Sequence, residues 1–125
     1  MLSNLCNKYK RYRPRLVVLF GSRARGDWLE HSDYDVLVVA DELPSDPREA
    51  FAALYDPEEP LVMPIGIRSD RFLERLSRGD TFLLEVIEDG KIICADKGFL
   101  EKVMEVYERV RKRFTRRGRA WIRLG

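Results

Sequence analysis

The sequence predicts an α/β domain: a mixed sheet of about four strands, flanked by helices and followed by a long C-terminal helix. Two short apolar blocks rich in β-branched residues, at 16–20 and 36–39, are typical of strands buried on both faces. Segments with helical periodicity alternate with the strands. The chain has 125 residues, 45% of them apolar, which suits one hydrophobic core and leaves no room for a second folded domain. We therefore expect 1–125 to form a single domain.

The first half of the chain contains three predicted strands and three helical segments. Ser3 can cap a short helix that runs to about Tyr12, and Pro14 ends it. Pro64 interrupts the third strand, so we expect that strand at an edge of the sheet or bulged. The predicted strands are 16–20, 33–40 and 61–67, and the helical segments after the first are 23–29 and 44–55.

The second half is expected to add three helices and a fourth strand. Ser69 and Asp80 are the expected caps of the first two helices, and Asp89-Gly90 is expected to turn the chain into the strand. Apolar residues at helical spacing as far as Phe114 predict a long last helix. The predicted helices are about 69–78, 80–88 and 98–117, and the strand is 91–95.

Composition excludes a membrane-spanning helix and a disulfide scaffold. The longest stretch without a charge is the eight residues 60–67, whereas a bilayer requires about 20. Residues 1–7 lack the apolar run of a signal peptide and Lys8 follows at once, so we expect a cytoplasmic protein with no membrane contact. Cys6 and Cys94 are too few for a cysteine zinc cage, and each is expected as a reduced, buried thiol.

The formal net charge of +2 hides a segregation of charge along the chain. Residues 1–15 hold five basic and no acidic side chains, 109–125 hold eight basic and none acidic, and 16–108 hold 10 basic and 21 acidic. The basic ends could fold back on the acidic body, bind a polyanion or dock on an acidic partner. The C-terminal extension 116–125 adds Trp121 to its arginines, a mixture that suits RNA or a protein partner, and equally a solvated helix end.

One pair of motifs points to chemistry. Gly21-Ser22 follows the first buried strand, and Asp33 and Asp35 open the second. Side chains two apart in a strand point the same way, so the carboxylates project together from Cα atoms about 7 Å apart. They repel each other unless a cation lies between them, and Mg²⁺ prefers such oxygens together with waters and phosphates. A glycine before a serine lets a phosphate approach the backbone, so the pattern predicts a site for a magnesium-bound nucleoside triphosphate.

Each of these features is ordinary when taken alone. A Gly-Ser at a strand end is usually a turn, and an Asp-x-Asp is often a solvated strand entrance; their joint occurrence beside buried strands is what favours a nucleotide site. Arg23 and Arg25 are candidates to add positive charge to bound phosphates, and Arg68 is a similar candidate. His31, the single histidine, is expected as a polar loop residue rather than a ligand.

The segment GSRARGDWLEHSDYDVLVV, residues 21–39, resembles the signature of the DNA polymerase beta nucleotidyltransferase superfamily, in particular the minimal nucleotidyltransferases of archaea and bacteria. The order of elements is similar from about residue 10 to residue 96. The resemblance implies a nucleotidyltransferase fold in which Gly21 and Ser22 hold the triphosphate. It further implies that Asp33 and Asp35 are catalytic and ligate Mg²⁺ while a nucleophile displaces pyrophosphate.

The chain departs from this signature at one position. Active members present a third carboxylate on the strand after the next helix, where it helps to bind a second metal ion and to deprotonate the attacking hydroxyl. The expected position here falls on Met63, and the strand contains no acid. Glu58, Glu59 and Asp70 lie just outside the strand and substitute only if it is shifted. Loss of this group would slow transfer while leaving nucleotide binding intact.

The resemblance therefore supports two functional hypotheses. The first is an enzyme that binds Mg-NTP, with ATP as the expected nucleotide, and transfers a nucleoside monophosphate to a protein or other acceptor. Members of this kind often pair with a HEPN-domain protein in toxin–antitoxin modules, which makes a HEPN protein a candidate partner. The second is a nucleotide-binding or partner-binding regulatory module without transfer activity. An RNA-binding protein that uses the basic ends is a third alternative, and self-association is left open.

Overall fold

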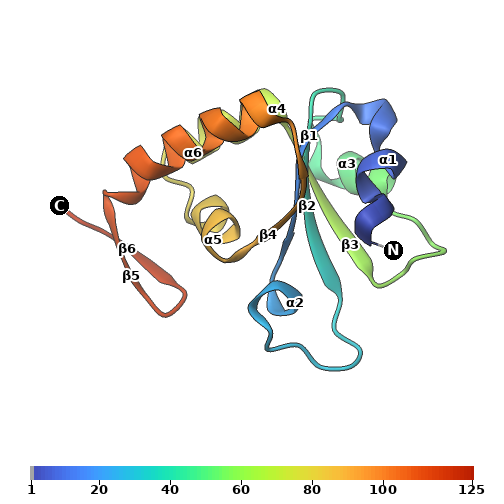
Figure 1. Cartoon of the computed structure of the whole chain (residues 1–125), viewed down its shortest axis with the longest axis horizontal. Coiled ribbons are helices and arrows are strands. Elements are labelled where there is room, and N and C mark those ends of the chain that lie inside the picture. Colours follow the sequence, from blue (N-terminus) through green and yellow to red (C-terminus); the bar gives the residue numbers. More distant parts are fainter. Residues whose placement is uncertain (1) are drawn as a thin grey trace.

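The computed structural model describes residues 2–125 and contains a mixed four-stranded sheet in the order β3-β2-β1-β4 (Figure 1). Strand β1 is antiparallel to both β2 and β4, whereas β3 runs parallel to β2. The predicted α/β class and sheet are therefore confirmed, and β3, which contains Pro64, lies at an edge as expected. The strands are β1 (Pro14–Phe20), β2 (Tyr34–Ala40), β3 (Val62–Arg68) and β4 (Lys91–Ala95).

Helices cover both faces of the sheet. In Figure 1, α1 and α3 lie on one side of the strands, and α4, α5 and α6 lie on the other. Short 3₁₀ turns, η1 and η2, flank α1. The bounds are η1 (Leu2–Asn4), α1 (Leu5–Lys8), η2 (Lys10–Tyr12), α2 (Ser22–Arg25), α3 (Pro47–Leu54), α4 (Ser69–Ser77), α5 (Thr81–Asp89) and α6 (Lys97–Arg111).

The middle of each central strand is apolar, and both faces of that part are buried. Alternate side chains enter two separate core clusters, one beneath α4, α5 and α6 and the other beneath α1 and α3. The first cluster includes Leu16, Val18, Leu37 and Val39, and the second includes Val17, Leu19, Val36 and Val38. This alternation decides on which face each side chain of the candidate site emerges.

Helix caps were predicted with mixed success. Asp80 caps α5 as expected, because its carboxylate accepts a hydrogen bond from the Leu83 N–H at 3.2 Å. The predicted cap at Ser69 is wrong: Arg68 occupies the cap position of α4. The Ser69 hydroxyl instead donates to Asp41 at 2.6 Å, because the folded sheet brings that carboxylate within reach.

The N-terminal segment differs from prediction in two ways. The single helix expected up to Tyr12 is divided into η1, α1 and η2, and Arg13 then adopts a left-handed conformation with φ 55° before β1 begins. The expectation of two reduced thiols is also wrong, since Cys6 and Cys94 form a disulfide. Packing of α1 against β4 brings their Cα atoms to 6.4 Å, a normal separation for this bond.

The C-terminal helix is shorter than predicted. It ends at Arg111, and the chain then forms a hairpin of β5 (Phe114–Arg117) and β6 (Ala120–Arg123), which turns at Gly118 with φ 60°. Phe114 was assigned to the apolar side of the helix and is buried, but it is buried from β5. Tertiary packing of this side chain overrides the helical periodicity that continued through it.

The acidic body and the basic C-terminal end meet in the folded chain. The Arg116 guanidinium donates two hydrogen bonds to Asp89, at 2.8 and 2.5 Å. Of the three arrangements that the charge segregation allowed, folding back on the body is therefore realised at this residue.

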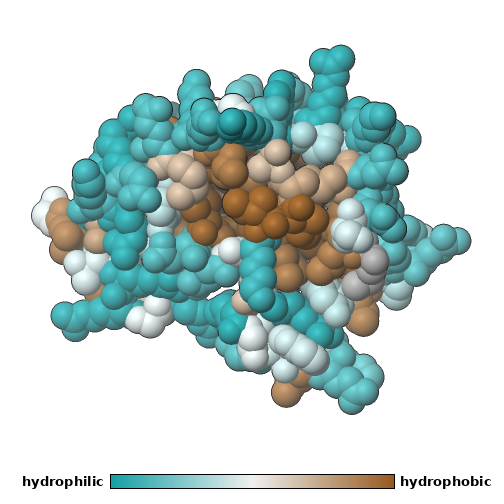
Figure 2. All heavy atoms as spheres, viewed as in Figure 1, coloured by the Kyte–Doolittle hydropathy of each residue, from teal (hydrophilic) through white to brown (hydrophobic). Residues whose placement is uncertain are grey.

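No helix among residues 2–125 has the length and apolar character needed to cross a bilayer. Figure 2 shows that hydrophobic surface gathers over α5 and β4, surrounded by hydrophilic side chains.

The disulfide closes a loop of 88 residues and should contribute to stability by restricting the unfolded chain. We expect Cys6→Ser to lower the free energy of unfolding by about 2–4 kcal/mol. Chemical denaturation with and without reductant measures this, and reductant should lower the stability of the wild type to that of the variant without affecting the variant. If the wild type is equally stable with and without reductant, and two thiols can be titrated in the absence of reductant, the disulfide is contradicted.

Candidate functional site

The candidate site begins where the end of β1 meets the start of β2. Antiparallel pairing places Phe20 opposite Asp35, so Gly21 lies directly beside the carboxylate. A Cβ at Gly21 would collide with Oδ2 of Asp35, and the backbone there has φ 74°. Only glycine satisfies both constraints, because it has no Cβ and adopts left-handed angles freely. The Gly-Ser bend therefore approaches Asp35, one of the two predicted acids.

Asp35 projects from the sheet toward α5. Leu37 and Val39, which continue its alternation along β2, belong to the cluster beneath α4, α5 and α6. The carboxylate is half-buried and has no hydrogen-bond partner among residues 2–125. Burial raises the pKa of Asp35, the negative charge of Asp33 raises it further, and the positive charge of Arg25 opposes both.

A cavity of about 330 Å³ opens over this carboxylate. The end of β1, the start of β2, α2, α5 and the turn of the C-terminal hairpin enclose it. Four of the predicted site residues line it together: Gly21, Ser22, Arg25 and Asp35. Asp33 immediately precedes β2, is exposed, and interacts with Asp35 through its charge. The remaining lining residues are Phe20, Phe82, Glu85, Val86, Asp89 and Arg119.

Arg23 lies away from the cavity. Its guanidinium carbon lies 4.1 Å from the ring centre of Trp28 and 4.2 Å from that of Tyr34, and its nitrogens donate to the Ser32 carbonyl at 3.1 and 3.2 Å. These contacts fasten the loop between α2 and β2. The structure therefore gives Arg23 a role in holding this loop, rather than bringing it together with the other predicted phosphate-binding residues.

Met63 lies next to Asp35 on the neighbouring strand. The parallel register pairs the two residues, and Ile67, which shares the face of Met63, belongs to the core cluster on the side of Asp35. Adjacent strands lie about 4.8 Å apart, so a thioether occupies the position beside the carboxylate where an acid was expected. Within residues 2–125 no group of three or more His, Cys, Asp or Glu side chains is arranged to hold a metal ion.

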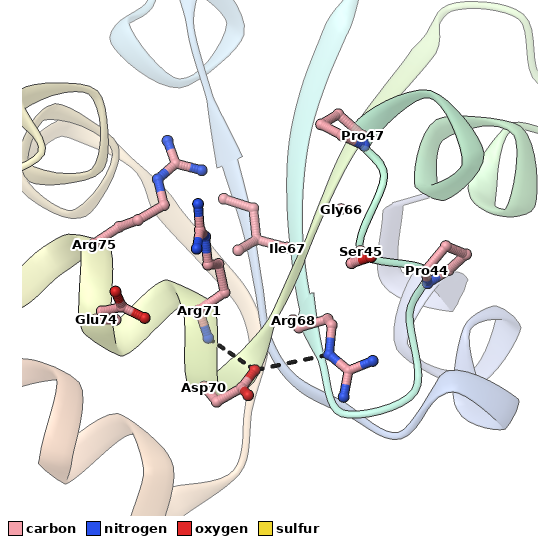
Figure 3. A pocket seen from close by; sticks show the side chains of 10 residues that line it. All are labelled: Pro44, Ser45, Pro47, Gly66, Ile67, Arg68, Asp70, Arg71, Glu74 and Arg75. Atoms are coloured by element: carbon pink, nitrogen blue, oxygen red, sulfur yellow. Dashed lines mark hydrogen bonds and ion pairs between the residues drawn. The ribbon is translucent and has the colours of Figure 1, made fainter.

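Two of the acids flanking β3 have other partners. Glu59 forms an ion pair with Lys8 at 2.9 Å, and Asp70 lies 3.8 Å from Arg68 in the first turn of α4. Arg68 belongs to a different cavity, of about 550 Å³, between β3, α4 and the loop before α3 (Figure 3). The register pairs Met63 with Asp35, so β3 is not shifted in the way that a substitute acid would require.

Three charged groups of the cavity wall were not predicted from the sequence. Glu85 and Asp89 lie one helical turn apart on α5, a spacing that could have been recognised as one acidic face. The Arg116 guanidinium holds the pKa of Asp89 below its usual range. One oxygen of Glu85 is buried without a hydrogen bond, 3.9 Å from that guanidinium. Arg119 was not recognised because 98–117 was predicted as helix and 116–125 as a basic extension, so no hairpin was expected.

The family model for the nucleotidyltransferase domain matches residues 2–113. The chain belongs to this family. Its fold is similar to that of a chain from a toxin–antitoxin complex crystallised with AMP-PNP, with a TM-score of 0.55, 20% identity, and coverage of 90% of this chain and 91% of that one. A chain from a mutant of the toxin–antitoxin MntA-HpeT is similar as well, with a TM-score of 0.55, 16% identity and 90% of each chain covered.

A sequence relative of this nucleotidyltransferase domain occurs in Methanocaldococcus jannaschii. That protein is provisionally named a protein adenylyltransferase, and it is 54% identical over 33 residues. The match covers 25% of this chain and 33% of the relative. The predicted membership of the nucleotidyltransferase superfamily is confirmed by the family match, and the predicted nucleotidyltransferase fold is confirmed by the structural likeness.

The ion pair between Asp89 and Arg116 should make stability depend on pH. Because the folded-state pKa of Asp89 is lowered, its contribution is present above the unfolded pKa of about 3.9 and is lost as pH falls through the folded value. We expect Asp89→Asn to cost about 1 kcal/mol at pH 7 and less near pH 2. Urea denaturation at both values tests this, with Glu42→Gln, an exposed acid, as the unaffected control. An equal cost at both pH values would contradict the prediction.

Proposed function

We propose that this nucleotidyltransferase domain binds a magnesium-bound nucleoside triphosphate, ATP in the first instance, and transfers its nucleoside monophosphate to a protein acceptor. The observation that carries the proposal is the packing of Asp35 against the bare backbone of Gly21 at the mouth of a cavity. A metal-binding acid and a phosphate-accessible bend then act on the same ligand. The family and the fold support the reaction class.

The acidic pair has the chemistry of a site for one divalent cation. Asp35 is half-buried, carries a like charge on Asp33 nearby, and accepts no hydrogen bond from residues 2–125. A hard cation between the two carboxylates would remove their repulsion and replace the lost solvent of Asp35. Met63 offers only a thioether, a poor ligand for Mg²⁺, where a further carboxylate would stand. The residues therefore fit one magnesium ion.

The residues of the cavity would divide the work as follows. The backbone at Gly21 and Ser22 and the Ser22 hydroxyl would bind phosphate oxygens, while Arg25 would add positive charge. Asp33 and Asp35 would hold Mg²⁺, which lowers the negative charge of the phosphate that is attacked. With no acid at position 63, this chain supplies no group there to take the proton of an acceptor hydroxyl.

The comparisons support a protein as the acceptor. The relative in M. jannaschii is provisionally named a protein adenylyltransferase, and the structural neighbours come from toxin–antitoxin complexes. We therefore propose that this domain acts on a partner protein in a module of that kind. A HEPN-domain protein is the candidate that the family resemblance indicates.

A second candidate function rests on Met63. A domain that keeps the cavity and one metal ion but lacks the third acid would bind nucleotide and a partner without transferring anything, as a regulatory module. Incubation with labelled ATP, Mg²⁺ and the candidate partner separates the two functions. Covalent label on the partner excludes the regulatory module, whereas nucleotide binding without label favours it.

The role of the acidic pair can be tested by titrating Mg-ATP into Asp33→Asn and Asp35→Asn. We expect each variant to bind at least about tenfold more weakly than the wild type in Mg²⁺, because a metal ligand is lost. Isothermal titration calorimetry measures the affinities, and Glu30→Gln, an exposed acid in the adjoining loop, should bind as the wild type does. Unchanged affinity in both aspartate variants would refute this assignment of the site.

The effect of Met63 can be tested by restoring the acid. Because a carboxylate at this position can accept a proton, Met63→Asp should raise the rate of partner labelling roughly 10- to 100-fold. Met63→Asn should have no such effect, because asparagine has the shape of aspartate but no charge. Near-UV circular dichroism checks that both variants fold. Equal rates in Met63→Asp and Met63→Asn would argue against position 63 as the cause of weakened transfer.

A further inference from the structure

The C-terminal hairpin supplies one wall of the nucleotide cavity. Arg119, in the turn between β5 and β6, lines the cavity together with the predicted site residues Gly21 and Asp35. The family model ends at residue 113, just before the hairpin begins. The wall is therefore built by a segment beyond the part of the chain that matches the family.

The hairpin is held against the body by specific contacts. Phe114 is buried and meets Trp121 edge to face, with ring centres 6.3 Å apart. The guanidinium of Arg111, at the end of α6, lies 4.7 Å from the centre of the same indole. Arg116 bridges β5 to Asp89 of α5 with a two-point ion pair, and its side chain is 15% exposed. Figure 1 shows β5 and β6 beside α5, so the turn is positioned by the fold.

The hairpin also changes the charge of the cavity. The carboxylates of Asp35, Glu85 and Asp89 line it, and their combined negative charge would repel a polyanion. Arg116 reaches from β5 to neutralise Asp89 and lies 3.9 Å from Glu85. The negative charge of the α5 acids is thereby offset by an arginine of the hairpin. The acidic pair at the start of β2 remains available for a cation.

Arg119 is the second arginine that the hairpin brings to the cavity. Within residues 2–125 its side chain makes no hydrogen bond, ion pair or cation-π contact, in contrast to Arg116 and Arg25, whose guanidinium groups are engaged with Asp89 and Asp27. A guanidinium is always charged and offers paired donors that match the oxygens of a phosphate. An unengaged guanidinium on the wall of a nucleotide cavity is chemically suited to the triphosphate.

We propose that Arg119 binds phosphate oxygens of the nucleotide, which makes the C-terminal hairpin part of the active site. This inference rests on the proposed function and assigns to the site a residue outside the family motif. Arg116 is a positioning residue in this arrangement, because it acts by holding the hairpin turn and by balancing the acids of α5.

The test compares Arg119→Ala with Arg117→Ala. Arg117 precedes the same turn, is exposed, carries the same charge and does not line the cavity. Calorimetric titrations with Mg-ATP and with magnesium tripolyphosphate, at about 150 mM salt to screen distant charges, measure both variants. We expect Arg119→Ala to weaken both ligands about tenfold, and Arg117→Ala to change each less than about twofold.

Several outcomes would overturn the inference. Equal weakening in Arg117→Ala and Arg119→Ala would reduce the effect to net charge, and weakening of Mg-ATP alone would place Arg119 on the nucleoside rather than the phosphates. Binding that Asp35→Asn abolishes and Arg119→Ala leaves unchanged would refute the role of Arg119 while retaining the proposed function. A wild type that binds neither ligand would refute both. Matching thermal unfolding curves for the two variants exclude a folding defect.

Discussion

The pairing of β1 with β2 is the interaction on which the candidate site depends. It brings an acidic side chain against the backbone of Gly21 and removes part of that carboxylate from water, an arrangement that costs free energy in the absence of a cation. The two strands can hold Asp35 there because their inward residues fill a core on both faces of the sheet. Burial of these faces stabilises the sheet enough to tolerate a half-buried charge at the start of β2.

Charge segregation along the chain is resolved by contacts between distant segments. Arg15, near the start of β1, pairs with Asp41 directly after β2, and Lys8 of α1 pairs with Asp56 after α3. Arg116 completes the pattern at the other end of the chain. Three residues of the basic ends therefore pair with acids of the body, and one of them, Arg116, also adds positive charge beside the cavity.

Local patterns predicted the strands well and the chain ends poorly. The run 16–20 was correctly interpreted as a strand buried on both faces, because β-branched residues without polar alternation leave few other structures. Helical periodicity continues as far as Phe114, yet the aromatic contact between Phe114 and Trp121 stabilises a hairpin there. Asp89 and its partner Arg116 are 27 residues apart, and no local signal relates them.

The sequence by itself indicated the candidate site, because the spacing of Asp33 and Asp35 reflects strand geometry, which is local and regular, and Gly21 follows the first predicted strand. It also indicated the absence of an acid at position 63, and the parallel register then placed Met63 beside Asp35. Only the tertiary structure decided that Arg23 fastens a loop, that Cys6 and Cys94 are joined, and that Arg119 lines the cavity. These outcomes depend on which surfaces pack together, and that is set by burial across the whole domain rather than by neighbours in the chain.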